Sequence, residues 1–340
     1  CLRDFDRIPT QEKAIVPPLA FEFEKPIIDL EQRIEQLKTE AQTDEALWFE
    51  VKRKEEELAD LKHRIYSNLT PWQRIQLARH LDRPHALDYI HAIFQNWMEI
   101  HGDRQFGDDK AILTGFAHFM GKPVAIIGQQ KGKDTKENLI RNFGMPHPEG
   151  YRKAMRLMRL AEKFRLPVIV LIDTPGAYPG VGAEERGQAE AIARNIRDMA
   201  LLETPVICCV IGEGASGGAL GVGVGDVVLM LENAWYCVIG PEACASILWR
   251  DAAMAPQAAK VMKMTAQDLD RLGIPDEIIP EPLGGAHRNP LESAHNVKRA
   301  LERHLDRLRR KRIPELLEDR FQKYRRIGAI VEDAAPAPSV

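Results

Sequence analysis

A glycine-rich segment in the middle of the chain has the composition of an anion-binding turn. Residues 212–218 read Gly-Glu-Gly-Ala-Ser-Gly-Gly and stand between an apolar run and a predicted helix. Glycine permits tight turns and lets a ligand approach the backbone N–H groups without a Cβ in the way. The first N–H groups of a helix have no intrahelical acceptor and favour negative charge. The segment therefore predicts a site for an anion, or for an oxyanion that develops during a reaction.

Several known motifs overlap this segment, and a ligand-free strand-to-helix turn is a further alternative. The spacing within 212–217 matches the dinucleotide fingerprint, which is a weak signal when it stands alone. The Gly-x-Ser-x-Gly spacing around Ser216 matches the nucleophile elbow of hydrolases. That interpretation needs an acid and a histidine downstream, for which Asp226 and His287 or His295 are available. A phosphate-binding P-loop is excluded, because no lysine follows the last glycine.

The elements that must position this segment follow an alternating strand–helix pattern. Two continuous apolar runs, 167–173 and 205–211, are typical of buried parallel strands. The helix predicted between them, over 184–202, has the length of a crossover connection between such strands. We therefore expect an α/β core with successive parallel strands. Further predicted elements are helices over 86–100, 151–165 and 241–249 and strands over 111–119, 123–129, 227–231 and 235–239.

The chain is predicted to have four parts. Residues 1–26 are polar and interrupted by prolines, as in an extended arm. Residues 27–68 repeat apolar positions at helical spacing on two segments, which predicts an antiparallel helical hairpin with a narrow apolar seam. So narrow a seam must find a partner: either the hairpin pairs with itself, or it docks on the main domain or on another subunit. We expect the hairpin to serve assembly. Residues 69–328 form the α/β domain, and the low-complexity tail 329–340 is expected to be disordered.

Composition and charge exclude several classes of protein. The 340 residues are 44% hydrophobic and 29% charged, and a net charge of −3 favours neither a nucleic acid nor a membrane surface as partner. No apolar stretch reaches the roughly 20 residues of a spanning helix. The five cysteines form no C-x-x-C pair, and the histidine spacing suggests no metal site. We therefore expect a reduced, intracellular protein without a metal of its own.

Three strings in a fixed order carry a resemblance to a known family. They are DTPGAYPG (173–180), EERGQAEA (184–191) and GEGASGGA (212–219). Together they resemble the core of the carboxyltransferase α subunit of the multi-subunit acetyl-CoA carboxylase of bacteria and plastids. One departure is Ala215, where the family usually has glycine. The supporting strings are QQKGKDTK (129–136), RNFGMP (141–146), PEACASILW (241–249) and IPEPLGGAHRNP (279–290).

The resemblance implies a crotonase-like fold of repeated ββα units and the synthesis of malonyl-CoA for fatty acid synthesis. In that family, carboxybiotin is a substrate on a separate biotin carboxyl carrier protein, and biotin carboxylase is a further component of the ATP-dependent complex. A β subunit that bears a zinc ribbon largely holds acetyl-CoA, and the expected assembly is α2β2. The absence of C-x-x-C agrees with an α subunit. Biotin is not expected to be attached to this chain, and the expected location is the bacterial cytoplasm rather than the plastid stroma.

The resemblance also implies roles for residues. The backbone N–H groups of Gly217 and Gly218 are expected to form an oxyanion hole for the ureido oxygen of biotin as CO2 leaves its N1. The biotin enolate would then deprotonate acetyl-CoA, so that no side chain acts as acid or base. The expected carboxybiotin pocket consists of Gly176, Ala177, Gly214, Ala215, Ser216 and Ala219.

Three lysines lie in the basic segment that follows the predicted strand over 123–129. Because lysine binds phosphate as a point charge, Lys131, Lys133 and Lys136 are candidates for the CoA phosphates, with a solvated basic loop as the alternative.

Other interpretations stay open. An acyl-CoA hydratase or hydrolase of the same fold would need a positioned carboxylate such as Glu184 or Glu185. A non-catalytic scaffold would use the hairpin to organise a complex. Residues 261–264, Val-Met-Lys-Met, resemble a biotinylation site, but their alanine-rich surroundings predict a helix instead of the β-turn that carries biotin.

Overall fold

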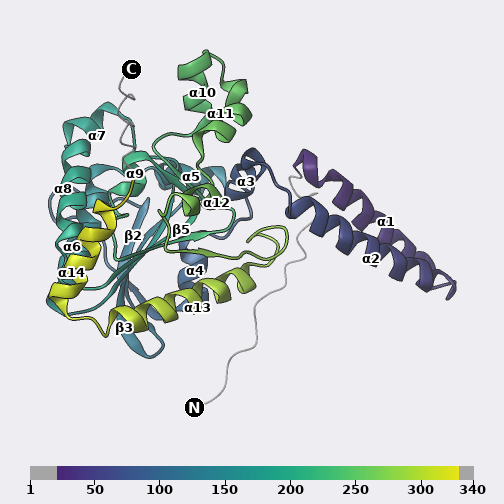
Figure 1. Ribbon diagram of the computed structural model, residues 1–340, viewed down its shortest axis with the longest axis horizontal. Coiled ribbons are helices and arrows are strands. Elements are labelled where there is room, and N and C mark those ends of the chain that lie inside the picture. The colour runs from purple at the N-terminus through teal and green to yellow at the C-terminus, as the bar shows by residue number, and fades with distance from the viewer. Residues whose placement is uncertain (1–20, 329–340) are drawn as a thin grey trace, which may run out of the picture. The chain divides into compact units, whose positions relative to one another are not determined.

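The computed structural model describes residues 21–328, in two compact units that divide between Ser67 and Asn68 (Figure 1). The predicted arm, residues 1–26, lies outside the described residues up to position 20, and the predicted tail 329–340 lies wholly outside them. None of the described helices is both long enough and apolar enough to cross a membrane.

The first unit consists of two antiparallel helices. Lys38 pairs with Glu55, and Lys62 pairs with Glu31, at 2.7 Å each. The later residue of the first helix therefore lies beside the earlier residue of the second helix, as in an antiparallel pair. The buried side chains between them are Ile34, Leu37, Ala41 and Val51. The bounds are η1 Glu22–Glu24, α1 Lys25–Ala41 and α2 Leu47–Tyr66.

The second unit is built on an eight-stranded sheet of order β1-β2-β3-β4-β5-β6-β8, in which β7 also pairs with β5. The first three strands are antiparallel, and the pairings from β3 onward are parallel. The predicted α/β class is therefore confirmed. The bounds are β1 Gln95–Glu99, β2 Ile112–Phe119, β3 Lys122–Gln129, β4 Val168–Thr174, β5 Val206–Ala215, β6 Val227–Leu231, β7 Trp235–Cys237 and β8 Glu277–Ile279.

Met120 and Gly121 form a two-residue turn between β2 and β3. Phe119 pairs with Lys122, and the φ angles of Met120 and Gly121 are 52° and 75°. Positive φ at both central positions is the hairpin geometry that matches the natural twist of two strands. The two strands predicted on either side of this turn, over 111–119 and 123–129, are confirmed.

The helix predicted over 86–100 is wrong in its second half. Helix α4 ends at Ile93, and β1 follows it as a strand on the edge of the sheet. A Cβ on Gly115 of β2 would lie 2.3 Å from the carbonyl oxygen of Met98, so this glycine leaves room for β1. Pairing with a strand distant in sequence therefore overrides the local helical spacing.

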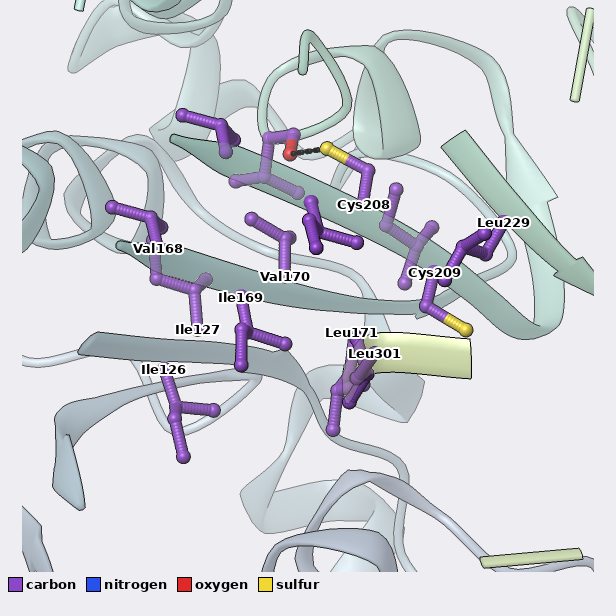
Figure 2. Packing of buried hydrophobic residues seen from close by; sticks show 14 of the residues in the cluster. Ile126, Ile127, Val168, Ile169, Val170, Leu171, Cys208, Cys209, Leu229 and Leu301 are labelled. Atoms are coloured by element: carbon purple, nitrogen blue, oxygen red, sulfur yellow. Dashed lines mark hydrogen bonds between the residues drawn. The ribbon is translucent and has the colours of Figure 1, made fainter. Parts of the chain in front are cut away.

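The core surrounds the central parallel strands. Every residue of β4 and β5 is buried, as expected of strands covered on both faces. Figure 2 shows side chains of β4, such as Val170, packed among those of β5, including Cys208, whose thiol donates to the carbonyl of Val222. Burial raises the pKa of the Cys208 thiol to about 12.

Helix α6 packs on α8, and α13 packs on α4. The helices of this unit are α3 Pro71–Ala78, α4 Ala86–Ile93, α5 Thr135–Ile140, α6 Pro148–Lys163, α7 Val181–Glu185, α8 Gln188–Ala200, α9 Ser216–Leu220, α10 Pro241–Trp249, α11 Ala255–Met262, α12 Ala266–Arg271, α13 Pro290–Leu308 and α14 Ile313–Arg325, with the 3-10 turns η2 Asn142–Gly144 and η3 Ala252–Met254.

Candidate active site

The glycine-rich segment begins as strand and ends as helix. Strand β5 continues through Ala215, and α9 starts at Ser216 without an intervening loop. The predicted turn is therefore wrong for residues 212–215, which belong to the strand. Gly214 pairs with Thr174 of β4 on one side and with Tyr236 of β7 on the other, and these pairings extend the strand.

The ends of β4 and β5 approach each other through two glycines. A Cβ on Gly218 would lie 2.4 Å from the carbonyl carbon of Gly176 and 2.6 Å from the backbone nitrogen of Ala177. Gly176 itself has a φ of 146°, which glycine adopts without strain. Glycine at position 218 thus allows the first turn of α9 to lie directly against the turn that follows β4.

The first N–H groups of α9 are not capped by a side chain. Ala215, at the N-cap, makes no side-chain hydrogen bond. Ser216, Gly217 and Gly218 occupy the first three helical positions, whose N–H groups have no acceptor within the helix. Adjacent main-chain donors of this kind can bind an oxyanion.

An apolar cavity of about 330 Å³ adjoins this helix start. Its wall includes Ser216 and Gly217 of α9, Tyr236 of β7 and Tyr324 of α14. The Tyr324 hydroxyl accepts from the backbone nitrogen of Gly225 at 2.8 Å, so its polar end is bonded within the protein. An apolar cavity with main-chain donors at its edge suits an organic ligand that carries few polar atoms.

The predicted pocket residues fall into two groups. Those at the meeting strand ends are Gly176, Ala177, Gly217 and Gly218, and Ser216 beside them borders the cavity. The other three are buried within the junction of strand and helix: Gly214, Ala215 and Ala219.

The three candidate lysines lie in different environments. The side chain of Lys131 is only 13% exposed, and its ammonium bonds to two buried carboxylates. Lys133 and Lys136 are exposed. The exposed ammonium of Lys133 pairs with Asp88 at 2.5 Å, so the three lysines differ in burial and in the carboxylates around them.

The carboxylates around Lys131 belong to a buried charged network that sequence reasoning missed. The Lys131 ammonium lies 2.6 Å from Asp173, at the end of β4, and 2.6 Å from Glu213, near the end of β5. His85 Nδ1 lies 3.1 Å from the second oxygen of Asp173, and Arg79 donates to Glu213 at 2.6 Å. The network ties together the strand ends that carry the two glycine turns.

The charges in this network outweigh the cost of burial. Burial would lower the pKa of Lys131, but Asp173 and Glu213 raise it. Burial would raise the pKa of Asp173, but the charge of Lys131 and the hydrogen bond of His85 hold it well below its usual range. These groups therefore remain ionised. Asp173 and Lys131 each lie in one of the strings that carry the family resemblance, 173–180 and 129–136, but only the topology places them side by side.

The described residues offer no partner for a nucleophilic Ser216. The backbone nitrogen of Asp226 donates to Val206, at the opposite end of β5, and its carboxylate pairs with Arg320 at 2.8 Å. His287 stacks on His80 with ring centroids 3.9 Å apart. Within residues 21–328, no hydrogen bond joins Ser216 to an acid or a histidine, so the elbow interpretation lacks its triad. The same range holds no group of three or more side chains that could bind a metal ion.

The sequence model of a family described as "Acetyl co-enzyme A carboxylase carboxyltransferase-like" matches residues 20–328. The chain belongs to this family. The acetyl-coenzyme A carboxylase carboxyl transferase subunit alpha of Shouchella clausii is 56% identical over 315 residues, which cover 92% of this chain and 97% of that one. The subunit alpha of Geobacter metallireducens is 54% identical over 311 residues, with 92% and 98% covered. The resemblance seen in the sequence is confirmed: this is a carboxyltransferase subunit of acetyl-CoA carboxylase.

Two solved structures share the fold of this carboxyltransferase subunit. The transcarboxylase 12S structure with methylmalonyl-coenzyme A bound has a TM-score of 0.53 at 21% identity, covering 66% of this chain and 42% of that one. A Pseudomonas malonate decarboxylase hetero-tetramer in complex with coenzyme A has a TM-score of 0.56 at 17% identity, covering 69% and 91%. At such identities the likeness concerns the fold alone, and it confirms the predicted crotonase-like class.

Proposed function

We propose that this subunit uses the N–H groups of Gly217 and Gly218 as an oxyanion hole for carboxybiotin. The observation that carries the proposal is the uncapped start of α9, which lies against Gly176 and borders the apolar cavity. When the bond between N1 and the carboxylate of carboxybiotin breaks, CO2 leaves and negative charge develops on the ureido oxygen. A preorganised N–H donor stabilises such a charge by about 3–4 kcal/mol.

The remaining steps need no acid or base from this chain. The biotin enolate takes a proton from the methyl group of acetyl-CoA, and the resulting acetyl enolate attacks CO2 to form the new C–C bond of malonyl-CoA. In support, Asp173 and Glu213 are bonded to Lys131 and keep lowered pKa values, as in a structural role. Glu184 and Glu185, one of which a hydratase would need, are exposed on α7.

The other half of the site is assigned to a partner. The name of the relatives, subunit alpha, implies a β subunit. In this proposal a zinc-ribbon β subunit holds acetyl-CoA in an α2β2 assembly in the cytoplasm, and the biotin carrier protein and biotin carboxylase are further partners. Lys133 and Lys136 contact the CoA phosphates, since both are exposed, although the Lys133 ammonium must leave Asp88 to do so. Lys131 is left out because its ammonium is buried between two carboxylates.

A proline substitution tests the oxyanion hole. Gly217→Pro removes the N–H donor at a position in the first helical turn, where that N–H has no acceptor within the helix. Because Ser216 before it has a φ of 57°, the fold of this variant must be measured together with its activity. Gly217→Ala is the matched control, since it keeps the N–H and its Cβ would lie 3.4 Å from Ile192, an ordinary contact. We expect Gly217→Pro to lose about 10²–10³-fold in kcat for malonyl-CoA formation with the β subunit.

Sedimentation and thermal unfolding show whether each variant folds and assembles. Near-normal turnover by a folded, assembled Gly217→Pro enzyme contradicts the proposal.

A further inference from the structure

The side chain of Gln129 links three structural elements beside the proposed oxyanion hole. Gln129 is the last residue of β3 and is fully buried. Its Nε2 donates to the carbonyl of Gly218 in α9 at 2.7 Å, and its Oε1 accepts from the backbone nitrogen of Asp173 in β4 at 3.2 Å. One amide thus joins the ends of β3 and β4 to the first turn of α9. The orientation of this amide is determined, because the Asp173 N–H can only donate and the Gly218 carbonyl can only accept.

The carbonyl of Gly218 depends on this side chain for its main hydrogen bond. The backbone bonds at the end of α9 run from Gly221 to Gly217, from Val222 to Ala219 and from Gly223 to Leu220, and none of them uses the carbonyl of Gly218. Apart from Gln129, its described partner is the hydroxyl of Tyr151, at 3.5 Å. Because α9 has only five residues, its own hydrogen bonds cannot fix its direction, and bonds from neighbouring elements must do so.

We propose that Gln129 is a positioning residue for carboxyl transfer. By holding the Gly218 carbonyl, it fixes the rotation of the first turn of α9 and hence the direction of the Gly217 and Gly218 N–H groups. By accepting from Asp173, the same amide is tied to the strand that leads into Gly176, the other wall of the hole. Gln129 does not touch substrate, and the inference rests on the oxyanion hole proposed above.

Gln129→Glu makes this link switchable by pH. A protonated carboxyl group has nearly the shape of the amide, donates through its O–H to Gly218 and still accepts from Asp173. The ionised form has no donor for Gly218. Burial raises the pKa of a carboxyl group by up to about 3–5 units, toward an assay range of about pH 6 to 8. The titratable groups around it are Asp173, Lys131, Glu213, His85 and Tyr151.

Gln129→Leu is the matched variant that cannot form either bond at any pH. Against wild type, we expect kcat of Gln129→Glu to be close to normal near pH 6 and to fall at least about tenfold by pH 8, with the KM for acetyl-CoA little changed. Gln129→Leu should be slow at both pH values. The ratio of each variant to wild type removes the pH dependence of the reaction itself.

Three results overturn the proposal. The first is a near-normal kcat in a folded, assembled Gln129→Leu enzyme. The second is a dependence of kcat on pH in Gln129→Glu that is parallel to that of wild type. The third is a fall in the kcat of Gln129→Glu that vanishes when kcat is expressed per folded site. The last measurement uses circular dichroism at the assay temperature, and it decides the question even if Gln129→Leu does not fold. An active Gly217→Pro enzyme refutes the oxyanion hole itself. If Gly217→Pro is inactive and Gln129→Leu is active, only the positioning role of Gln129 is refuted.

Discussion

Gly218 lies so close to Gly176 that a Cβ at position 218 would be 2.4 Å from the Gly176 carbonyl carbon. The first turn of α9 and the turn after β4 therefore form one packed unit, although the two glycines are 42 positions apart in the chain. The contact is between backbones, which cannot give way as a flexible side chain can. The glycine at 218 has a packing role that is separate from its proposed N–H donor.

Gly218→Ala should therefore destabilise the protein as well as slow it. Forcing a methyl group into packed backbone costs about 1–3 kcal/mol. Gly217→Ala meets only Ile192, at 3.4 Å, and should change the free energy of unfolding little. Thermal unfolding of both variants measures the difference, and equal melting temperatures would contradict the close packing at Gly218.

Ser216 is expected to contribute no nucleophile. Ser216→Ala should retain most of the carboxyltransferase activity, whereas loss of a hydrolase nucleophile would cost several orders of magnitude. Ser216 has a φ of 57°, so Ser216→Gly should relieve backbone strain of about 1–2 kcal/mol. Labelling of Ser216 by a fluorophosphonate, with loss of activity, would favour a hydrolase instead.

Lys131→Met should destabilise the fold strongly. It removes the ammonium that Asp173 and Glu213 share and leaves buried carboxylates without that partner. Breaking a buried ion pair from one side costs about 3–5 kcal/mol. Lys133→Met, at an exposed lysine in the same segment, should stay within about 0.5 kcal/mol. Urea unfolding at neutral pH compares the two, and equal effects would contradict the structural role of Lys131.

The effect of Lys131→Met should depend on pH. In the intact protein the pKa of Asp173 is lowered, so its contribution to stability is present above the unfolded pKa of about 3.9 and is lost as pH falls through the lower folded pKa. Without Lys131, burial should raise that pKa, and the contribution is then lost as pH rises. The destabilisation should therefore be larger near pH 7 than near pH 4. A difference that does not change with pH would show that the carboxylate is not the responsive group.

Sequence patterns predict best those helices and strands whose conformation depends on the residues within them and not on contacts with distant segments. The apolar runs 167–173 and 205–211 correspond to β4 and β5 because a parallel strand buried on both faces is continuously apolar. The helix over 241–249 is confirmed with the same bounds, since Pro241 favours a helix start. The extension of β5 and the bond from Gln129 to Gly218 join distant segments. No local pattern contains that information, and for the same reason the sequence alone does not distinguish Lys131 from its exposed neighbours.

Residues 261–264 are expected to remain without biotin. Helix α11 ends at Met262, and Lys263 caps it with a φ of 52°, so the lysine stands at a helix end and not in a turn between two strands. Intact mass spectrometry after co-expression with a biotin ligase should show no adduct. An adduct on Lys263 would make the chain its own carrier.

The hairpin of α1 and α2 is predicted to serve assembly and not chemistry. Its seam is already filled, and Leu58 packs against that seam, so a charge at Leu58 would unfold the hairpin instead of testing its surface. Phe49 is a better probe, because 80% of it is exposed on α2 and an apolar side chain of that size gains by burial against a partner. Phe49→Ser should weaken association and shift the sedimentation profile to smaller species.

Lys52→Ser is the control for this prediction, since Lys52 is also exposed on α2 but is not apolar. The Lys52 variant should assemble normally, and the residual assembled fraction of Phe49→Ser should turn over at the normal rate per site. That rate is the decisive quantity, because a hairpin that only joins subunits changes how many sites form and leaves each site unaltered. Unchanged assembly of Phe49→Ser with a lower rate per site would instead assign the hairpin a part in the chemistry.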